Sequence, residues 1–260
     1  MITVTDSSKK FLPFDLTPLY IQRSYEAELS IVPDALASFE AFEKGEGETT
    51  KSSICEYVND AAHRPDFLVT GFVGRKGPKL NPTILGSSAD YSLRSAHCTS
   101  IIIKPRYLDV ESQCDRQKFS FICAVDGSVA AKSAFEDVMK IFDPELDEVV
   151  VVHIHNDVDE SETEKTESLK AEYEEALSAA KAVNGSVKLI EKEQDKTIAQ
   201  MLVHEVDTLE AQFLAVGADG MRAYVEGAES FLGSVSDYCV RHARSSIIVA
   251  QNNTVQSTLK

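Results

Sequence analysis

The stretch VGADGMRAYVEGAESFLGSVSDYCVRHARSSIIVA, residues 216–250, contains the signals that decide the fold. An apolar strand ends at Gly217, Gly220 follows, Gly233-Ser234 opens a helix, and SIIVA forms another strand. Glycine lets a backbone turn tightly and lets an anion approach the amide groups. The free N–H groups at a helix N-terminus attract such an anion. The pattern therefore predicts either a phosphate-binding turn or a pair of tight corners without a ligand.

An earlier stretch repeats this pattern. FLVTGFVG at 67–74 matches FLAVGADG at 213–220, and LGSxxDY recurs at 85–91 and 232–238. The offset is 146 residues in the first block and 147 in the second. Solenoid units repeat every ~20–50 residues, so this period indicates a duplicated domain.

Composition excludes several classes of protein. A chain of 260 residues with 43% apolar residues can form one large packed domain or two ordinary ones. Its apolar runs fall short of the ~20 residues of a spanning helix, and its start lacks a signal-peptide core. Five scattered cysteines without a CxxC pair fit a reducing compartment, so we expect a cytoplasmic protein. A net charge of -16 argues against nucleic acid or a membrane as partner.

The second half alternates strand and helix patterns. Ser128 and Thr197-x-x-Gln200 are expected to cap helices. The stretch 157–185 is expected to start as an acidic loop and to become a helix that ends at Asn184-Gly185, with the acidic run 157–175 as a solvated loop and helix face. The runs of β-branched and aromatic residues predict strands at 119–125, 148–154, 186–192, 212–218 and 246–250. This order predicts a doubly wound parallel α/β sheet.

Ligands of such sheets bind at the carboxyl ends of the strands, where the strand order reverses. Asp126-Gly127-Ser128 follows the first strand of this half, and Gly217-x-x-Gly220 follows the fourth. Gly233-Ser234 then opens the last helix. Because these groups converge on one edge, a ligand site is a better explanation than tight corners alone.

The first copy lacks part of this pattern. In the second copy, 94 positions separate Phe119 in the first predicted strand from Phe213 in the fourth. Phe67 is the counterpart of Phe213, but only 66 residues precede it, so roughly one βα unit is missing from the first copy. Asp15 is the nearest candidate for the missing aspartate, residues 33–44 are predicted to be helical, and Ser53-x-x-Glu56 is a candidate capping box. We predict an incomplete domain at 1–112 and a complete one at 113–260.

The motifs CAVDGS (123–128), VVVVHI (149–154), VGADG (216–220) and LGSVSDYCVRHARSSIIVA (232–250) resemble a tandem universal stress protein. The resemblance implies two doubly wound domains of the adenine nucleotide α-hydrolase-like fold, paired through their last strands as an internal pseudo-dimer, the first of them degenerate. It implies ATP as ligand, with AMP and ADP as alternatives. The implied cofactor-binding residues are Asp126 and Ile154 beside the adenosine, Gly217, Gly220, Gly233, Ser234, Val235 and Ser236 around the phosphates, and Arg222 in the loop.

Two departures from the family pattern weaken this assignment. Twelve residues separate Gly220 from Gly233, whereas nucleotide-binding members have nine, and the first copy has eleven. The second-copy loop also carries Asp219, Glu226 and Glu229, which repel phosphates unless Mg²⁺ bridges them. The first-copy loop is basic instead, with residues Arg75, Lys76 and Lys79. We therefore expect at most one nucleotide per chain, in the second copy, with a weak anion site in the first.

Three functions follow from these observations. The first is an adenine-nucleotide-binding regulator of stress responses without strong catalysis. The second is an interaction protein of the same fold without a nucleotide, and the third is a slow ATPase. The sequence indicates no catalytic residue and no metal ligand set, and it lacks P-loop and dinucleotide-binding motifs. It leaves open any homo-oligomer beyond the internal pseudo-dimer.

Overall fold

The computed structural model describes residues 2–5, 40–73, 83–104, 118–156, 160–220 and 232–251. The chain divides into two compact units, residues 1–57 and 58–260. In the smaller unit, β1 (Ile2–Thr5) pairs in parallel with β2 (Glu40–Glu43). The helix α2 (Thr50–Asn59) begins in that unit and ends in the larger one.

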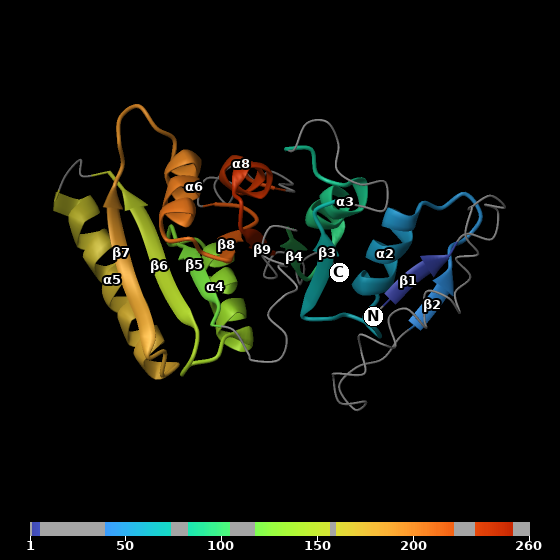
Figure 1. The fold of residues 1–260 in the computed structure, drawn as a ribbon, viewed down its shortest axis with the longest axis horizontal. Coiled ribbons are helices and arrows are strands. Elements are labelled where there is room, and N and C mark those ends of the chain that lie inside the picture. The colour runs from blue at the N-terminus through green and yellow to red at the C-terminus, as the bar shows by residue number, and fades with distance from the viewer. Residues whose placement is uncertain are drawn as a thin grey trace. The chain divides into compact units, whose positions relative to one another are not determined.

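The larger unit is built on a seven-stranded sheet (Figure 1). Its described strands follow the order β3-β4-β9-β8-β5-β6-β7 across the sheet. Every pair of neighbours is parallel except β4 and β9, which run antiparallel. The strands are β3 (Phe67–Gly71), β4 (Thr99–Ile103), β5 (Ser120–Ala124), β6 (Glu148–His155), β7 (Asn184–Glu191), β8 (Phe213–Gly217) and β9 (Ser246–Ala250).

Helices pack on both faces of this sheet. Buried residues of α4 (Val129–Ile141) and α5 (Glu160–Ala179) form one core with β5, β6, β8 and β9. Buried residues of α3 (Ser87–Ser95), α6 (Ile198–Thr208) and α8 (Ser234–His242) form a second core. In the described part of the chain, none of these helices is long and apolar enough to cross a membrane.

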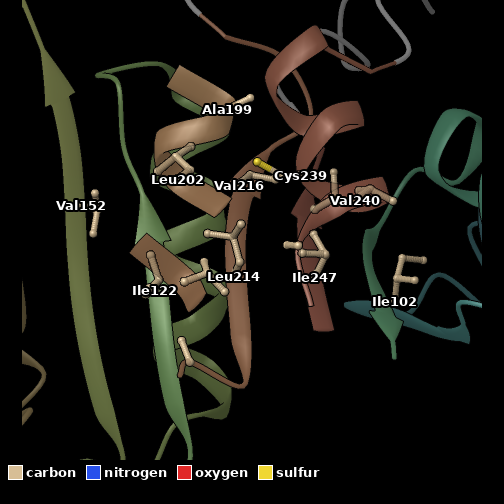
Figure 2. Close-up of a cluster of buried hydrophobic side chains, with 14 of the residues drawn as sticks. Ile102, Ile122, Val152, Ala199, Leu202, Leu214, Val216, Cys239, Val240 and Ile247 are labelled. Carbon is tan, nitrogen blue, oxygen red and sulfur yellow. The ribbon is translucent and has the colours of Figure 1, made fainter. Parts of the chain in front are cut away.

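The second core extends without a break from β6 to β4. Figure 2 shows Val152, Ile122, Leu214 and Ile247 along successive strands beneath α6 and α8, with Ile102 beyond them on β4. Leu214, Ile247 and Ile102 are completely buried. Burying a side chain of this size contributes about 1.5–3 kcal/mol. The shared core therefore joins β4 firmly to the rest of the sheet.

The strands predicted for residues 113–260 are confirmed, with ends that differ by at most two residues. Two predicted helix caps are also present. The Ser128 hydroxyl accepts a hydrogen bond from the N–H of Ala131. Thr197 and Gln200 form the reciprocal capping box expected from their spacing.

Three predictions of local structure were wrong. Residues 40–43 of the expected helix at 33–44 form β2, because pairing with β1 overrides helix propensity; residues 33–39 lie outside the described residues. Ser53 lies inside α2, and Thr49 and Ser52 form the reciprocal bonds at its start. The Asn184–Gly185 pair begins β7 rather than ending α5, since the chain turns earlier, at Lys181, whose φ is 56°.

The junction between β4 and β9 has reciprocal contacts. Ile101 pairs with Ile248, and the guanidinium groups of Arg94 and Arg241 contact Asp237 and Asp90 at 3.1 and 3.3 Å. The two ion pairs are counterparts in the sequence repeat, because Arg94 aligns with Arg241 and Asp90 aligns with Asp237, each 147 residues apart. The segments β3–α3–β4 and β8–α8–β9 therefore contact each other reciprocally across this junction.

Candidate functional site

The strand order reverses between β5 and β8. From β5 the chain continues to its neighbour β6 on one side, whereas its other neighbour is β8, which comes later in the sequence. The carboxyl ends of β5 and β8 therefore lie at a topological switch point, where ligands of such sheets bind. Asp126 and Gly127 follow β5 at this edge, and Gly127 has a φ of 82°, which favours glycine.

Asp126, Gly220 and Gly233 meet at this edge although they come from separate parts of the chain. A Cβ atom placed on Gly220 would lie 3.0 Å from Oδ2 of Asp126. The N–H of Gly233 donates to the carbonyl oxygen of Ala218 at 2.6 Å. A Cβ atom on Gly233 would lie 3.6 Å from the Cα of Asp219. The two glycines thus keep the backbone close to the aspartates without intervening side chains.

Gly217 has a packing role. A Cβ atom at this position would lie 2.7 Å from the carbonyl carbon of Ala130 and 2.7 Å from the nitrogen of Ala131. Both atoms belong to the backbone of the first turn of α4, so neither can rotate away. The contact requires glycine at 217 whether or not a ligand binds.

The N-terminus of α8 faces the same edge and has no side-chain cap. Gly233 is the N-cap residue, and no side chain hydrogen-bonds there. The first N–H groups of a helix lack partners within it, so this end favours an anion. Ser234 is exposed, whereas Ser236 is buried and its hydroxyl donates to the carbonyl oxygen of Gly217 at 2.5 Å. The Ser236 side chain therefore ties α8 to the end of β8.

The remaining predicted site residues lie in different surroundings. Val235 is half-buried and packs against the second core. Ile154 is only 9% exposed and belongs to the same core, so its side chain lies beneath the edge rather than on it. Arg222 and the loop glutamates lie outside the described residues, as do Asp15 and the basic loop of the first copy.

The described part of the site is acidic. Burial raises the pKa of Asp219, and the nearby Asp126 carboxylate raises it further. Asp126 is exposed, and its Oδ1 accepts a hydrogen bond from the N–H of Ser128 at 2.9 Å. Asp237 in the first turn of α8 has a lowered pKa, first because Arg241 hydrogen-bonds to it and also because Arg94 is close. Within the described ranges, no three potential metal-ligating side chains gather in one place.

Sequence reasoning did not assign a role to three residues that support this edge. Nδ1 of His153 lies 2.8 Å from the carbonyl oxygen of Val125, which precedes Asp126. Arg94 and Lys104, from the strand-helix-strand segment β3–α3–β4, contact the two ends of α8. The repeat aligns Arg94 with Arg241, but only the folded arrangement shows that each contacts the helix of the other copy.

A sequence model of the Universal stress protein family matches residues 120–251, just over half of the chain. The chain therefore belongs to the universal stress protein family. No curated protein matches the sequence.

Solved structures of the same fold are similar to this chain. A universal stress protein from Archaeoglobus fulgidus shares 18% identity, with 95% of this chain and 83% of that chain covered and a TM-score of 0.53. A functionally unknown protein from Pseudomonas aeruginosa shares 12% identity, covering 99% and 95%, with a TM-score of 0.53. An Arabidopsis thaliana family member with AMP bound shares 15% identity, covering 53% and 94%, with a TM-score of 0.38.

Proposed function

We propose that this protein is an adenine-nucleotide-binding regulator that holds one nucleotide at the carboxyl edge between β5 and β8. The observation that carries the proposal is the convergence of Asp126, Gly220 and Gly233 at the uncapped N-terminus of α8. Membership of a family in which an AMP-bound structure is known supports it.

The two ends of the nucleotide would meet different groups. The phosphates would lie against the free N–H groups of α8 and the exposed Ser234 hydroxyl, with Gly220 and Gly233 allowing close approach of the backbone. Asp126 would accept hydrogen bonds from the adenosine. Ile154 would support that end from below, because its side chain is part of the core.

The aspartate pair determines which nucleotide the site accepts. Asp126 and Asp219 are close enough for Asp126 to raise the pKa of Asp219. A triphosphate carries more negative charge than a monophosphate, and nearby carboxylates repel both unless a cation intervenes. The proposal therefore pairs ATP with Mg²⁺, which would offset this charge, and keeps AMP and ADP as alternatives. It includes no chemical step.

The same aspartates favour a second candidate function. An acidic edge without a compensating cation fits an interaction protein of this fold that has lost its nucleotide. Under this alternative, the glycines at 217, 220 and 233 would serve packing alone, as Gly217 does against α4.

We further propose that the chain contains its own dimerisation partner. The reciprocal contacts of Arg94 and Arg241 across the β4·β9 junction support a degenerate first copy within residues 1–112 and an internal pseudo-dimer. β9 is then covered on both sides, by β8 and β4, and does not offer an exposed edge for a second chain.

Titration calorimetry of the full chain with ATP and AMP, with and without Mg²⁺, tests the nucleotide proposal. We expect one nucleotide per chain, and an affinity at least about tenfold lower in Asp126→Ala, because hydrogen bonds to a charged group contribute about 1.5–3 kcal/mol. Glu145→Ala is the matched control, since Glu145 is exposed before β6 at the opposite edge of the sheet. An unchanged affinity in Asp126→Ala contradicts the assignment, and absence of wild-type binding favours the interaction protein.

A further inference from the structure

We propose that the β3–α3–β4 segment, residues 67–104, sets the affinity of the nucleotide site by holding α8 at both ends. Arg94 and Lys104 are the positioning residues, and neither contacts the nucleotide. The inference rests on the proposed function, because it concerns the helix whose N-terminus would meet the phosphates. It assigns the first copy a role in ligand binding that does not require a nucleotide site of its own.

Lys104 holds the C-terminal end of α8. Its side chain is 7% exposed, and its ammonium group donates to the carbonyl oxygens of Val240 at 2.6 Å and Ala243 at 2.5 Å. It also lies 4.6 Å from the centre of the Phe72 ring. The last carbonyl groups of a helix lack partners within it, and a cation there is favourable. Lys104 therefore supplies hydrogen-bond donors to two carbonyl groups at the C-terminal end of α8.

The equivalent contact on the other side of the junction is weaker. Gln251 occupies the position that matches Lys104 in the repeat, and its amide donates to the carbonyl oxygen of Leu93 in α3 at 2.9 Å. This is one bond from an uncharged group, whereas Lys104 makes two from a cation. Hydrogen bonds from charged groups are roughly twice as strong as neutral ones. The C-terminal end of α8, the helix of the proposed nucleotide site, is therefore held more strongly than the corresponding end of α3.

Arg94 acts at the N-terminal end of α8. Asp237 lies in the first turn, where its carboxylate would repel an anion bound at the helix N-terminus. Nη2 of Arg94 lies 3.1 Å from Oδ1 of Asp237, and Nε of Arg241 lies 2.8 Å from Oδ2. Together with Asp90, which is 3.3 Å from Arg241, these four residues carry no net charge. Removing Arg94 would leave one net negative charge close to the anion-binding end.

The two contacts act on one short, rigid element. An α-helix of nine residues is about 13 Å long, so loosening its last turn displaces its first turn as well. The Ser236 hydroxyl connects that first turn to Gly217 at the end of β8. A shift in the position of α8 would therefore move the backbone groups that Gly220 and Gly233 leave accessible.

A double-mutant cycle in the full chain tests the role of Arg94. We expect Arg94→Gln to weaken ATP binding roughly three- to tenfold and to do so less at high salt, because salt screens partly exposed charges. Asp237→Asn should bind at least as tightly as wild type, and the double variant with Arg94→Gln, in which the cluster is again neutral, should bind like wild type. Lys118→Gln is the matched control, because it removes the same charge from the Glu148 ion pair at the other end of the sheet. Arg94 is 37% exposed, so the variant is expected to fold.

The role of Lys104 has its own readout. We expect Lys104→Met to weaken nucleotide binding and to speed hydrogen exchange of the α8 amides, with Lys104→Gln between it and wild type. If the wild type binds nucleotide and both Arg94→Gln and Lys104→Met bind it with unchanged affinity, this inference is overturned and the proposed function stands. Absence of nucleotide binding by the wild type overturns the proposed function, and this inference with it.

Discussion

Replacing Gly217 by alanine should destabilise the fold, whereas the equivalent change at Gly71 should not. The two glycines occupy matching positions in the repeat, 146 residues apart. A Cβ atom on Gly217 would lie 2.7 Å from two backbone atoms of α4. On Gly71 the nearest atom is the carbonyl oxygen of Val73 at 3.3 Å. The contrast follows from α4, whose counterpart is expected to be missing from the first copy.

The size of the effect can be worked from these distances. Carbon atoms in contact prefer separations of about 3.5–4.0 Å, so β8 and α4 must separate by roughly 0.8 Å. Such overpacking costs about 1–3 kcal/mol, and the smaller backbone entropy of unfolded alanine offsets about 0.4–1 kcal/mol. The net loss of about 1–2 kcal/mol should lower the melting temperature by about 2–8 °C in a chain of this size.

Thermal melts and urea unfolding of Gly217→Ala and Gly71→Ala provide the measurement. We expect the Gly71 variant to stay within about 0.5 kcal/mol of wild type, as surface substitutions usually do. Equal losses in the two variants would refute the reasoning, because the contact with α4 would then not distinguish the two positions.

Three further predictions concern the junction, the buried Lys104 and the half-buried Asp219. Ile102→Ala should lower the free energy of unfolding by about 2–4 kcal/mol, because the side chain is fully buried beside β9. Val69 is 58% exposed on the edge strand, so Val69→Ala should change the free energy of unfolding little, and urea unfolding of both variants checks this. Burial lowers the pKa of Lys104 to about 8, so between about pH 8 and 10 the unfolded chain binds more protons than the folded chain, and the contribution of Lys104 to stability should rise with pH by up to about 3 kcal/mol. Free energies of unfolding measured at pH 7.5 and 9.5 should show this rise in wild type and not in Lys104→Met. Burial raises the pKa of Asp219, so the charged carboxylate destabilises the folded state and protonation at lower pH removes this cost. Asp219→Asn should therefore raise the melting temperature at pH 7, and melts over a pH series should show this gain shrinking as the pH falls.

The local signals in the second half of the chain were sufficient to predict its sheet. Apolar β-branched runs and two helix caps have physical causes that act within a few residues, so Ser128 and Thr197 could be recognised without the fold. The segment at 33–44 shows the opposite case. Its residues favour a helix locally, yet residues Glu40–Glu43 form a strand through pairing with β1, and that partner is distant in sequence.

The individual roles of site residues depended on the packing. Gly217 and Gly220 look alike in sequence, but only Gly217 contacts the backbone of α4, and only Gly220 faces Asp126. Ser234 and Ser236 are likewise both near a helix start, yet one hydroxyl is exposed and the other is bound to Gly217. Tertiary contacts decide which residue of each pair packs against a neighbouring element and which faces the site, and the spacing of a motif does not contain this information.

Native mass spectrometry of the 260-residue chain, purified without added nucleotide and then titrated with ATP and Mg²⁺, tests the central claim most directly. The account predicts a single added nucleotide per chain in the wild type and in Glu145→Ala, and little or none in Asp126→Ala. Two nucleotides per chain, or the same occupancy in Asp126→Ala as in wild type, would contradict the assignment of the site to the edge between β5 and β8.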